Sequence, residues 1–131
     1  MNAFLIDLDN RPGEFARVSE AIAAKGINIT AITGATSGSS GRVVLTTDND
    51  TATRTVLGET NVTYAESEVT EASLRNEPGA LAKITRRLAN SGINIEAIMP
   101  TGMKGNEVSV AFITDDPATA RTLLAEATSQ S

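Results

Sequence analysis

The sequence predicts an α+β protein made of two tandem copies of one small unit, each an antiparallel sheet with helices on one face. Two observations support this prediction. When residues 8–32 are aligned with residues 74–98, 12 of the 25 positions are identical without a gap, which indicates an internal duplication. Each copy also shows the periodicities of strand, helix, strand, strand and helix in the same order. We therefore place the two copies at residues 1–66 and 67–131.

Each copy opens with a strand and a helix. Phe4, Ile6 and Leu8 alternate with Leu5, Asp7 and Asp9, which is typical of a strand with one mostly apolar face. Apolar residues then recur every three or four positions, as on one face of a helix: Phe15, Val18 and Ile22 in the first copy, and Leu81, Ile84 and Leu88 in the second. Pro12 is expected in the first turn of its helix. Gly26 and Gly92 are expected to end the two helices.

The second half of each copy is predicted to be a hairpin followed by another helix. Four segments have the composition of strands: 27–33, 42–47, 93–99 and 107–114. Polar loops are predicted between them at residues 34–41 and 100–106. Asp50 and Asp116 are expected to cap the last helix of each copy, because an aspartate side chain can accept from the free N–H groups of the first turn.

The last strand distinguishes the two copies. Residues 62–65 read as a fourth strand, which completes the βαββαβ order of the ferredoxin-like fold. The equivalent strand of the second copy would begin near residue 129, two residues before the end of the sequence. The second copy is therefore expected to lack its last strand and to leave a sheet edge open. An open edge pairs readily with another chain, so we expect a homodimer. Residues 62–74 contain no Gly or Pro, and we expect them to run nearly continuously from one sheet to the next.

Composition excludes several classes of function. The net charge of -5, with three Phe and one Tyr, argues against a nucleic-acid partner. The absence of His and Cys excludes thiol catalysis, His-based triads and the usual zinc sites, although a carboxylate-only Ca²⁺ or Mg²⁺ site stays open. We predict no cofactor, no metal and no catalytic residue. Short apolar runs and an acid at Asp7 predict neither a membrane span nor a signal peptide, so a cytoplasmic protein is expected.

The most constant positions of the duplication are polar or are glycines. Core positions change between copies, whereas Asn-x-Pro-Gly and Gly-Ile-Asn-Ile are kept. Pro-Gly can simply form a tight turn, and Asn10 and Asn76 can simply cap a helix. Asn28 and Asn94 are harder to explain structurally, because they lie at predicted strand starts, where asparagine is disfavoured.

These two motifs, in order and present twice, resemble those of the ACT domain. That family consists of small ligand-binding modules of βαββαβ fold, often attached to amino-acid biosynthetic enzymes. The resemblance covers essentially the whole chain as two tandem modules, with no catalytic domain. It implies a non-catalytic protein that binds an amino-acid effector at a module–module or subunit interface and regulates an amino-acid biosynthetic enzyme.

The resemblance also implies which residues bind the effector. In the family, the loop after the first strand and the start of a neighbouring module's second strand enclose the ligand. The matching positions are Asn10, Pro12, Gly13, Asn28, Ile29, Asn76, Pro78, Gly79, Ala80, Asn94 and Ile95. An Asn amide can both donate and accept, so it suits a zwitterion. Glu14 would repel a carboxylate at the first helix start, which favours the second module, where Ala80 stands instead. Alternatively, Asp9 or Glu14 could hold the ammonium group of the ligand in the first module. If modules pair side by side, Asn10 would meet Asn94, and Asn76 would meet Asn28.

Two other functions compete with this reading. The chain could be an assembly or docking module whose pockets no longer bind a ligand. It could also be a small enzyme, since the ferredoxin-like fold hosts several chemistries. No nucleophile–base pair stands out in the sequence, which makes the enzyme the weaker alternative.

Overall fold

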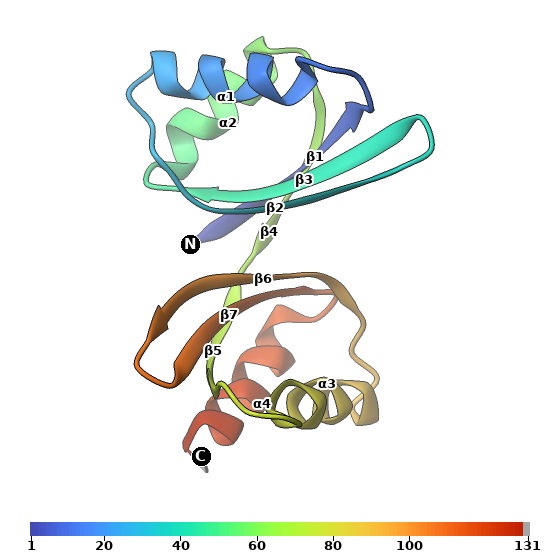
Figure 1. The fold of residues 1–131 in the computed structure, drawn as a ribbon, viewed down its shortest axis with the longest axis vertical. Coiled ribbons are helices and arrows are strands. Elements are labelled where there is room, and N and C mark those ends of the chain that lie inside the picture. Colours follow the sequence, from blue (N-terminus) through green and yellow to red (C-terminus); the bar gives the residue numbers. More distant parts are fainter. Residues whose placement is uncertain (130–131) are drawn as a thin grey trace. The chain divides into compact units, whose positions relative to one another are not determined.

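The computed structural model describes residues 1–129, with side chains up to residue 126. The chain divides into two compact units, Met1–Ser67 and Glu68–Ser131. In each unit two helices lie on one face of a sheet (Figure 1), which confirms the predicted α+β, ferredoxin-like class. The first unit contains β1 (Asn2–Asp9), α1 (Glu14–Ala24), β2 (Ile29–Ser37), β3 (Ser40–Thr47), α2 (Asp50–Glu59) and β4 (Thr63–Glu68). The second contains β5 (Thr70–Arg75), α3 (Ala80–Asn90), β6 (Ile95–Lys104), β7 (Glu107–Thr114) and α4 (Pro117–Ser129).

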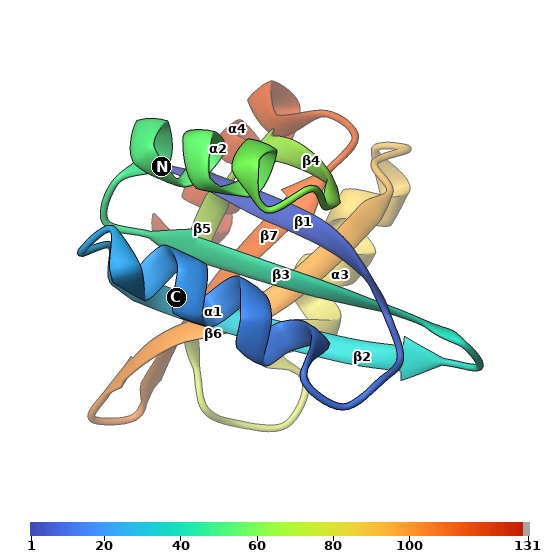
Figure 2. The same cartoon turned by 90° about the horizontal axis from the view of Figure 1, so that it is seen from above.

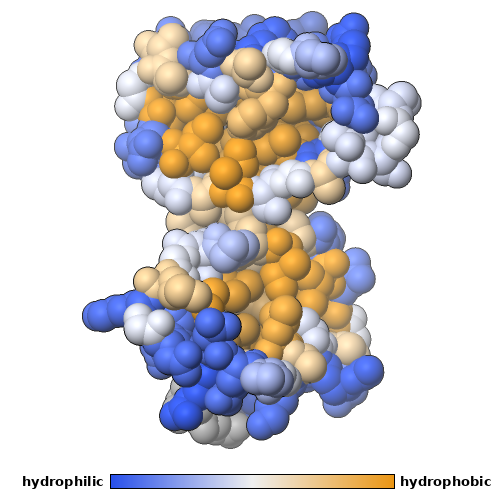
Figure 3. Space-filling model, viewed as in Figure 1, coloured by the Kyte–Doolittle hydropathy of each residue, from blue (hydrophilic) through white to orange (hydrophobic). Residues whose placement is uncertain are grey.

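The first unit has a four-stranded sheet in the order β2-β3-β1-β4. The strand β3 runs antiparallel to both neighbours, and its Val43 lies opposite Ile6 of β1. Both α1 and α2 lie over this sheet, as Figure 2 shows from above. The buried side chains between helices and sheet include Phe4, Val18 and Leu57. Figure 3 shows hydrophobic residues filling this layer, with hydrophilic residues along its margins.

The second unit repeats this layout with one strand fewer. Its sheet has the order β5-β7-β6, with Ala72 opposite Val110. The core contains Leu88, Phe112 and Leu124. Within residues 1–129 no strand follows α4, which stays helical up to the point where a fourth strand was expected to begin. The missing last strand of the second copy is thus confirmed, and one edge of β5 has no strand beside it in this unit.

The hairpins differ from the prediction. Both strand pairs continue through most of the predicted polar loops, so the connections shrink to residues 38–39 and 105–106. Gly38 and Gly105 have φ of 62° and 59°, the left-handed conformation that a two-residue hairpin turn requires. The loop prediction was wrong because these strand ends are exposed, and an exposed ladder does not need apolar residues.

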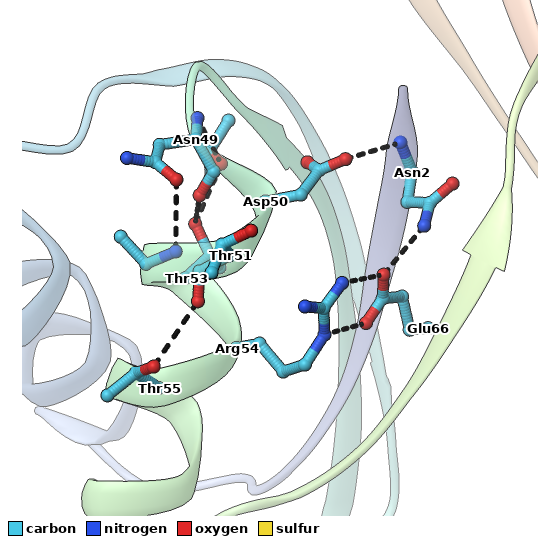
Figure 4. A network of polar contacts seen from close by, with 10 residues as sticks. Asn2, Asn49, Asp50, Thr51, Thr53, Arg54, Thr55 and Glu66 are labelled. Carbon is cyan, nitrogen blue, oxygen red and sulfur yellow. Dashed lines mark hydrogen bonds and ion pairs between the residues drawn. The ribbon is translucent and has the colours of Figure 1, made fainter.

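Two predicted helix starts were also wrong. The helix α1 begins at Glu14, after Gly13, so Pro12 lies in the preceding turn and not in the first helical turn. The cap of α2 is Asn49, whose side chain accepts a hydrogen bond from the Ala52 N–H at 3.0 Å. The carboxylate of Asp50 instead accepts from the backbone N–H of Asn2 at 3.1 Å (Figure 4).

Other predicted ends are confirmed. In the second unit, Asp116 caps α4 by accepting from the Thr119 N–H at 3.2 Å. Hydrogen bonds from Thr119, first from its side chain and then from its backbone, lower the pKa of the Asp116 carboxyl group. Gly26 and Gly92 follow the ends of α1 and α3 with φ of 73° and 74°. The segment that was predicted to run nearly continuously from one sheet to the next forms the strands β4 and β5, which are separated by Val69.

A polar network fixes β4 to its own unit. The Glu66 carboxylate accepts from Nε and Nη2 of Arg54, both at 2.7 Å, and from Nδ2 of Asn2 at 2.6 Å (Figure 4). These hydrogen bonds, that from Arg54 first, lower the pKa of Glu66 to about 2. Because Arg54 lies on α2 and Asn2 on β1, the network joins three elements of the unit.

Candidate functional site

The Asn-x-Pro-Gly motif forms the same turn in both units. In each copy the Asn backbone N–H reaches the neighbouring hairpin turn, from Asn10 to the Ser39 carbonyl at 2.9 Å and from Asn76 to the Asn106 carbonyl at 2.8 Å. Gly13 and Gly79 end the turn with φ of 89° and 88°. A Cβ built on either glycine would meet no atom within 4 Å. The turn therefore needs glycine for its conformation, and the space outside it is open to a ligand.

The two turn asparagines do not cap the helices. The Asn10 side chain donates from Nδ2 to the Gly38 carbonyl at 3.0 Å and so ties the turn to the β2–β3 hairpin. The Asn76 side chain is exposed and makes no hydrogen bond to the residues described. Both helices begin without a side-chain cap. The capping explanation for these two residues was therefore wrong.

Asn28 and Asn94 are held through their backbones and not through their side chains. The Asn28 N–H donates to Oδ1 of Asp48 at 3.0 Å, and the Asp48 N–H donates to the Asn28 carbonyl at 3.1 Å. Asn94 and Asp115 make the same pair at 2.9 and 3.2 Å. Both Asn side chains are exposed and have no hydrogen bond within the described residues. Two exposed amides thus lie at equivalent positions, where the same pair of backbone hydrogen bonds holds the chain.

The aspartate partners were absent from the predicted site. Asp48 and Asp115 match at an offset of 67 in the duplication, and that identity was the signal that could have found them. Ile29 and Ile95, by contrast, were predicted as ligand contacts but pack half-buried against the cores of their own units.

Within one unit the predicted residues do not meet. Gly13 precedes the first turn of α1, and Asn28 follows its last turn. A helix of 11 residues spans about 16 Å, so the turn and the asparagine lie at opposite ends of α1. The same holds for Gly79 and Asn94 around α3, which also has 11 residues. A site that uses both motifs therefore needs more than one module.

The second unit carries a groove of about 690 Å³ beside its turn. Its lining comes from the end of β5, the turn and one face of α3: Ser73, Leu74, Arg75, Glu77, Pro78, Gly79, Ala80, Lys83, Ile84, Arg86, Arg87 and Asn90. Three predicted residues line it, namely Pro78, Gly79 and Ala80. The predicted residues Asn76, Asn94 and Ile95 do not.

Four cations line this groove against a single carboxylate. The cations are those of Arg75, Lys83, Arg86 and Arg87, and the carboxylate belongs to Glu77. None of the four has an ion pair or side-chain hydrogen bond to any residue up to 126. Helical periodicity places Lys83, Arg86 and Arg87 on one helix, but it does not show that Arg75 of β5 lines the same groove.

Comparison with known proteins decides the family. Residues 3–59 and 69–127 match the ACT domain, one match for each unit. The chain belongs to the ACT domain family. The resemblance seen in the two repeated motifs is thereby confirmed, and each unit is an ACT module.

Solved structures show the same tandem fold. Protein BT0572 from Bacteroides thetaiotaomicron matches with a TM-score of 0.80 and 24% identity, over 95% of this chain and 86% of that one. The ligand-free regulatory subunit of aspartate kinase from Thermus thermophilus matches with a TM-score of 0.67 and 22% identity, over 96% and 90%. The corresponding subunit from Thermus flavus gives the same TM-score and identity, over 98% and 90%. No curated protein sequence matches the chain. Among the described residues, no helix has the length and apolar character needed to cross a bilayer.

Proposed function

We propose that this tandem ACT protein is a non-catalytic sensor that binds a free amino acid and regulates a biosynthetic enzyme in the cytoplasm. The observation that carries the proposal is the pair of exposed amides of Asn28 and Asn94, which have no hydrogen bond to the described residues. Their backbones are fixed by Asp48 and Asp115, so the amides are presented without a structural task. Such an amide can donate to a carboxylate or accept from an ammonium group.

The ligand contacts are completed by a second module. A turn and an asparagine at opposite ends of one helix cannot hold the same small molecule, whereas a turn of one module and the asparagine of another can. The open turns at Gly13 and Gly79 leave room for the ligand. Similarity to the regulatory subunits of aspartate kinase supports an enzyme as the regulated partner.

Thermal denaturation with each of the twenty amino acids tests this proposal. A ligand present at 100 times its dissociation constant adds about 2.7 kcal/mol to the free energy of unfolding. We expect one or a few amino acids at about 10 mM to raise the melting temperature. The Asn28→Ala, Asn94→Ala double variant should lose that increase. Thr55→Ala, on the exposed face of α2, should keep it. The sensor proposal fails if no amino acid shifts the transition.

The open edge of β5 favours a second candidate, an assembly module. Such an edge is stabilised when another chain pairs with it. The assembly module would form a homodimer or dock an enzyme whether or not a ligand is present. The Asn28→Ala, Asn94→Ala variant separates the two functions, because an assembly module would still bind its partner normally.

A further inference from the structure

The position of the groove in the second module is occupied in the first module by the residues that follow α2. There, the chain turns back after α2, and the Thr60 carbonyl accepts a hydrogen bond from Nη1 of Arg17 at 2.8 Å. Two residues later, Val62 packs against the core cluster that contains Leu8 and Val18. At the offset of 66, Arg17, Leu8 and Val18 correspond to three residues of the groove: Lys83, Leu74 and Ile84.

The second module leaves this place open because its last helix continues. The helix α2 ends at Glu59, whose equivalent at the offset of 67 is Glu126. The helix α4 extends beyond that position to Ser129. The chain therefore makes no equivalent of the turn at Thr60, and Lys83 has no carbonyl acceptor there among the described residues.

The side chains around this position also differ in charge between the modules, from mainly acidic or paired in the first to mainly basic in the second. In the first module the charges pair locally, with Arg11 at 3.2 Å from Asp9 and 3.0 Å from Glu14, and Arg17 at 3.4 Å from Glu14. In the second module Asp9 is replaced by Arg75, and Glu14 by Ala80.

On α3 the same inversion continues. Glu20 is replaced by Arg86, and the neutral Ala21 by Arg87. The result is four cations around one groove, none of them in an ion pair with a residue described up to 126, in a chain whose net charge is -5.

Unpaired cations held together repel one another, and an anion between them removes that cost. Hydrogen bonds between guanidinium or ammonium groups and carboxylate or phosphate are also stronger than neutral ones. The volume of about 690 Å³ lies in the range of ordinary small-molecule sites. Leu74 and Ile84 add an apolar floor, since both are buried.

We propose that this groove binds a small molecule with two or more negative charges, and that the effector is therefore an acidic amino acid or a comparable dianion. The inference rests on the proposed function, since it names the class of effector. In the first module, Thr60 and Val62 occupy the equivalent position, and Arg11 and Arg17 pair with acidic neighbours. Glu77 at the groove would accept the ammonium group of an acidic amino acid.

Isothermal titration calorimetry at constant ionic strength tests the inference. The ligands are L-aspartate, L-glutamate, succinate, inorganic phosphate, L-glutamine and L-lysine. We expect the dianions to bind, and the Lys83→Gln, Arg87→Gln variant to weaken their binding at least ~10-fold. The control variant, Lys25→Gln and Lys104→Gln, removes the same net charge from positions outside the groove lining. It should bind the dianions as the unmodified protein does.

The outcomes separate the inference from the proposed function. Binding of phosphate or succinate alone, lost in the groove variant, supports the dianion site but contradicts the amino-acid sensor. Binding of only neutral or basic amino acids, unchanged in the groove variant, overturns the dianion inference and leaves the sensor standing. Equal weakening in both variants would show general charge attraction and overturn the inference. The dianion inference also fails if the groove variant changes the sedimentation coefficient but not ligand binding, because a second copy of the chain would then cover the groove.

Discussion

Arg17 on α1 donates a hydrogen bond from Nη1 to the carbonyl oxygen of Thr60, 2.8 Å away, where the chain leaves α2. This contact marks the point at which the two modules diverge. In the first module the chain turns back and forms β4, whereas the equivalent residue Lys83 faces an open groove. The two repeats thus differ by one strand, and the repeat without that strand carries the basic groove.

Removing the Arg17 contact should weaken the first module. We expect Arg17→Ala to lower the free energy of unfolding by about 0.5–1 kcal/mol, because an exposed, charge-assisted hydrogen bond to Thr60 and a weak ion pair with Glu14 are lost. Lys83→Ala should change it by less than about 0.5 kcal/mol, since Lys83 has no comparable partner among the residues described up to 126. Urea denaturation measures both values. A larger loss in Lys83→Ala would show that Lys83 has a partner in solution.

The Glu66 network predicts a particular dependence of stability on pH. The pKa of Glu66 is lowered from 4.5 to about 2 in the folded protein, so the unfolded chain binds more protons between these values. The contribution of Glu66 to stability is therefore complete above the unfolded pKa and is lost as the pH falls towards 2. Glu66→Gln should flatten the dependence of the unfolding free energy on pH in this window. Glu59→Gln, which removes an exposed carboxylate without an ion pair to the described residues, serves as the control, and an equal flattening there would contradict the assignment.

The turn glycines should resist substitution for reasons of backbone conformation alone. Gly79→Ala places a side chain at φ of 88°, where a left-handed alanine costs about 1–2 kcal/mol. No atom lies within 4 Å of the new Cβ, so a steric clash adds nothing. Gly58→Ala within α2 should have the opposite sign and stabilise by about 0.5–1 kcal/mol. Thermal or urea denaturation measures both, and a neutral Gly79→Ala would show that the turn is not rigid in solution.

The contribution of α3 to stability should come from the buried face of the helix only. Leu88 is fully buried, and Leu88→Ala should cost about 2–5 kcal/mol of unfolding free energy. Leu81 on the same helix is 47% exposed, and Leu81→Ala should cost less than about 0.5 kcal/mol. Chemical denaturation distinguishes them. A similar loss in both variants would mean that another chain covers Leu81 in solution.

The sequence predicts the fold well because the repeat supplies the same pattern twice. The order of elements, the glycines at helix ends and the missing last strand all follow from periodicity and from the offset between copies. The caps and hairpins are harder, because Asn49 and Asp50 are equally good caps by composition, and exposed strand ends have no apolar pattern. The groove could not be predicted, since it depends on Arg75 of β5 lying beside Lys83 and Arg87 of α3.

The central claim is that a free amino acid binds where a turn and an asparagine of two modules meet. A titration followed by ¹H–¹⁵N NMR tests it most directly, with the amino acid that gives the largest thermal shift. We predict that the amide signals of Gly79 and Asn28, or those of Gly13 and Asn94, shift together with one dissociation constant. Saturating ligand that leaves all four signals in place would contradict the account.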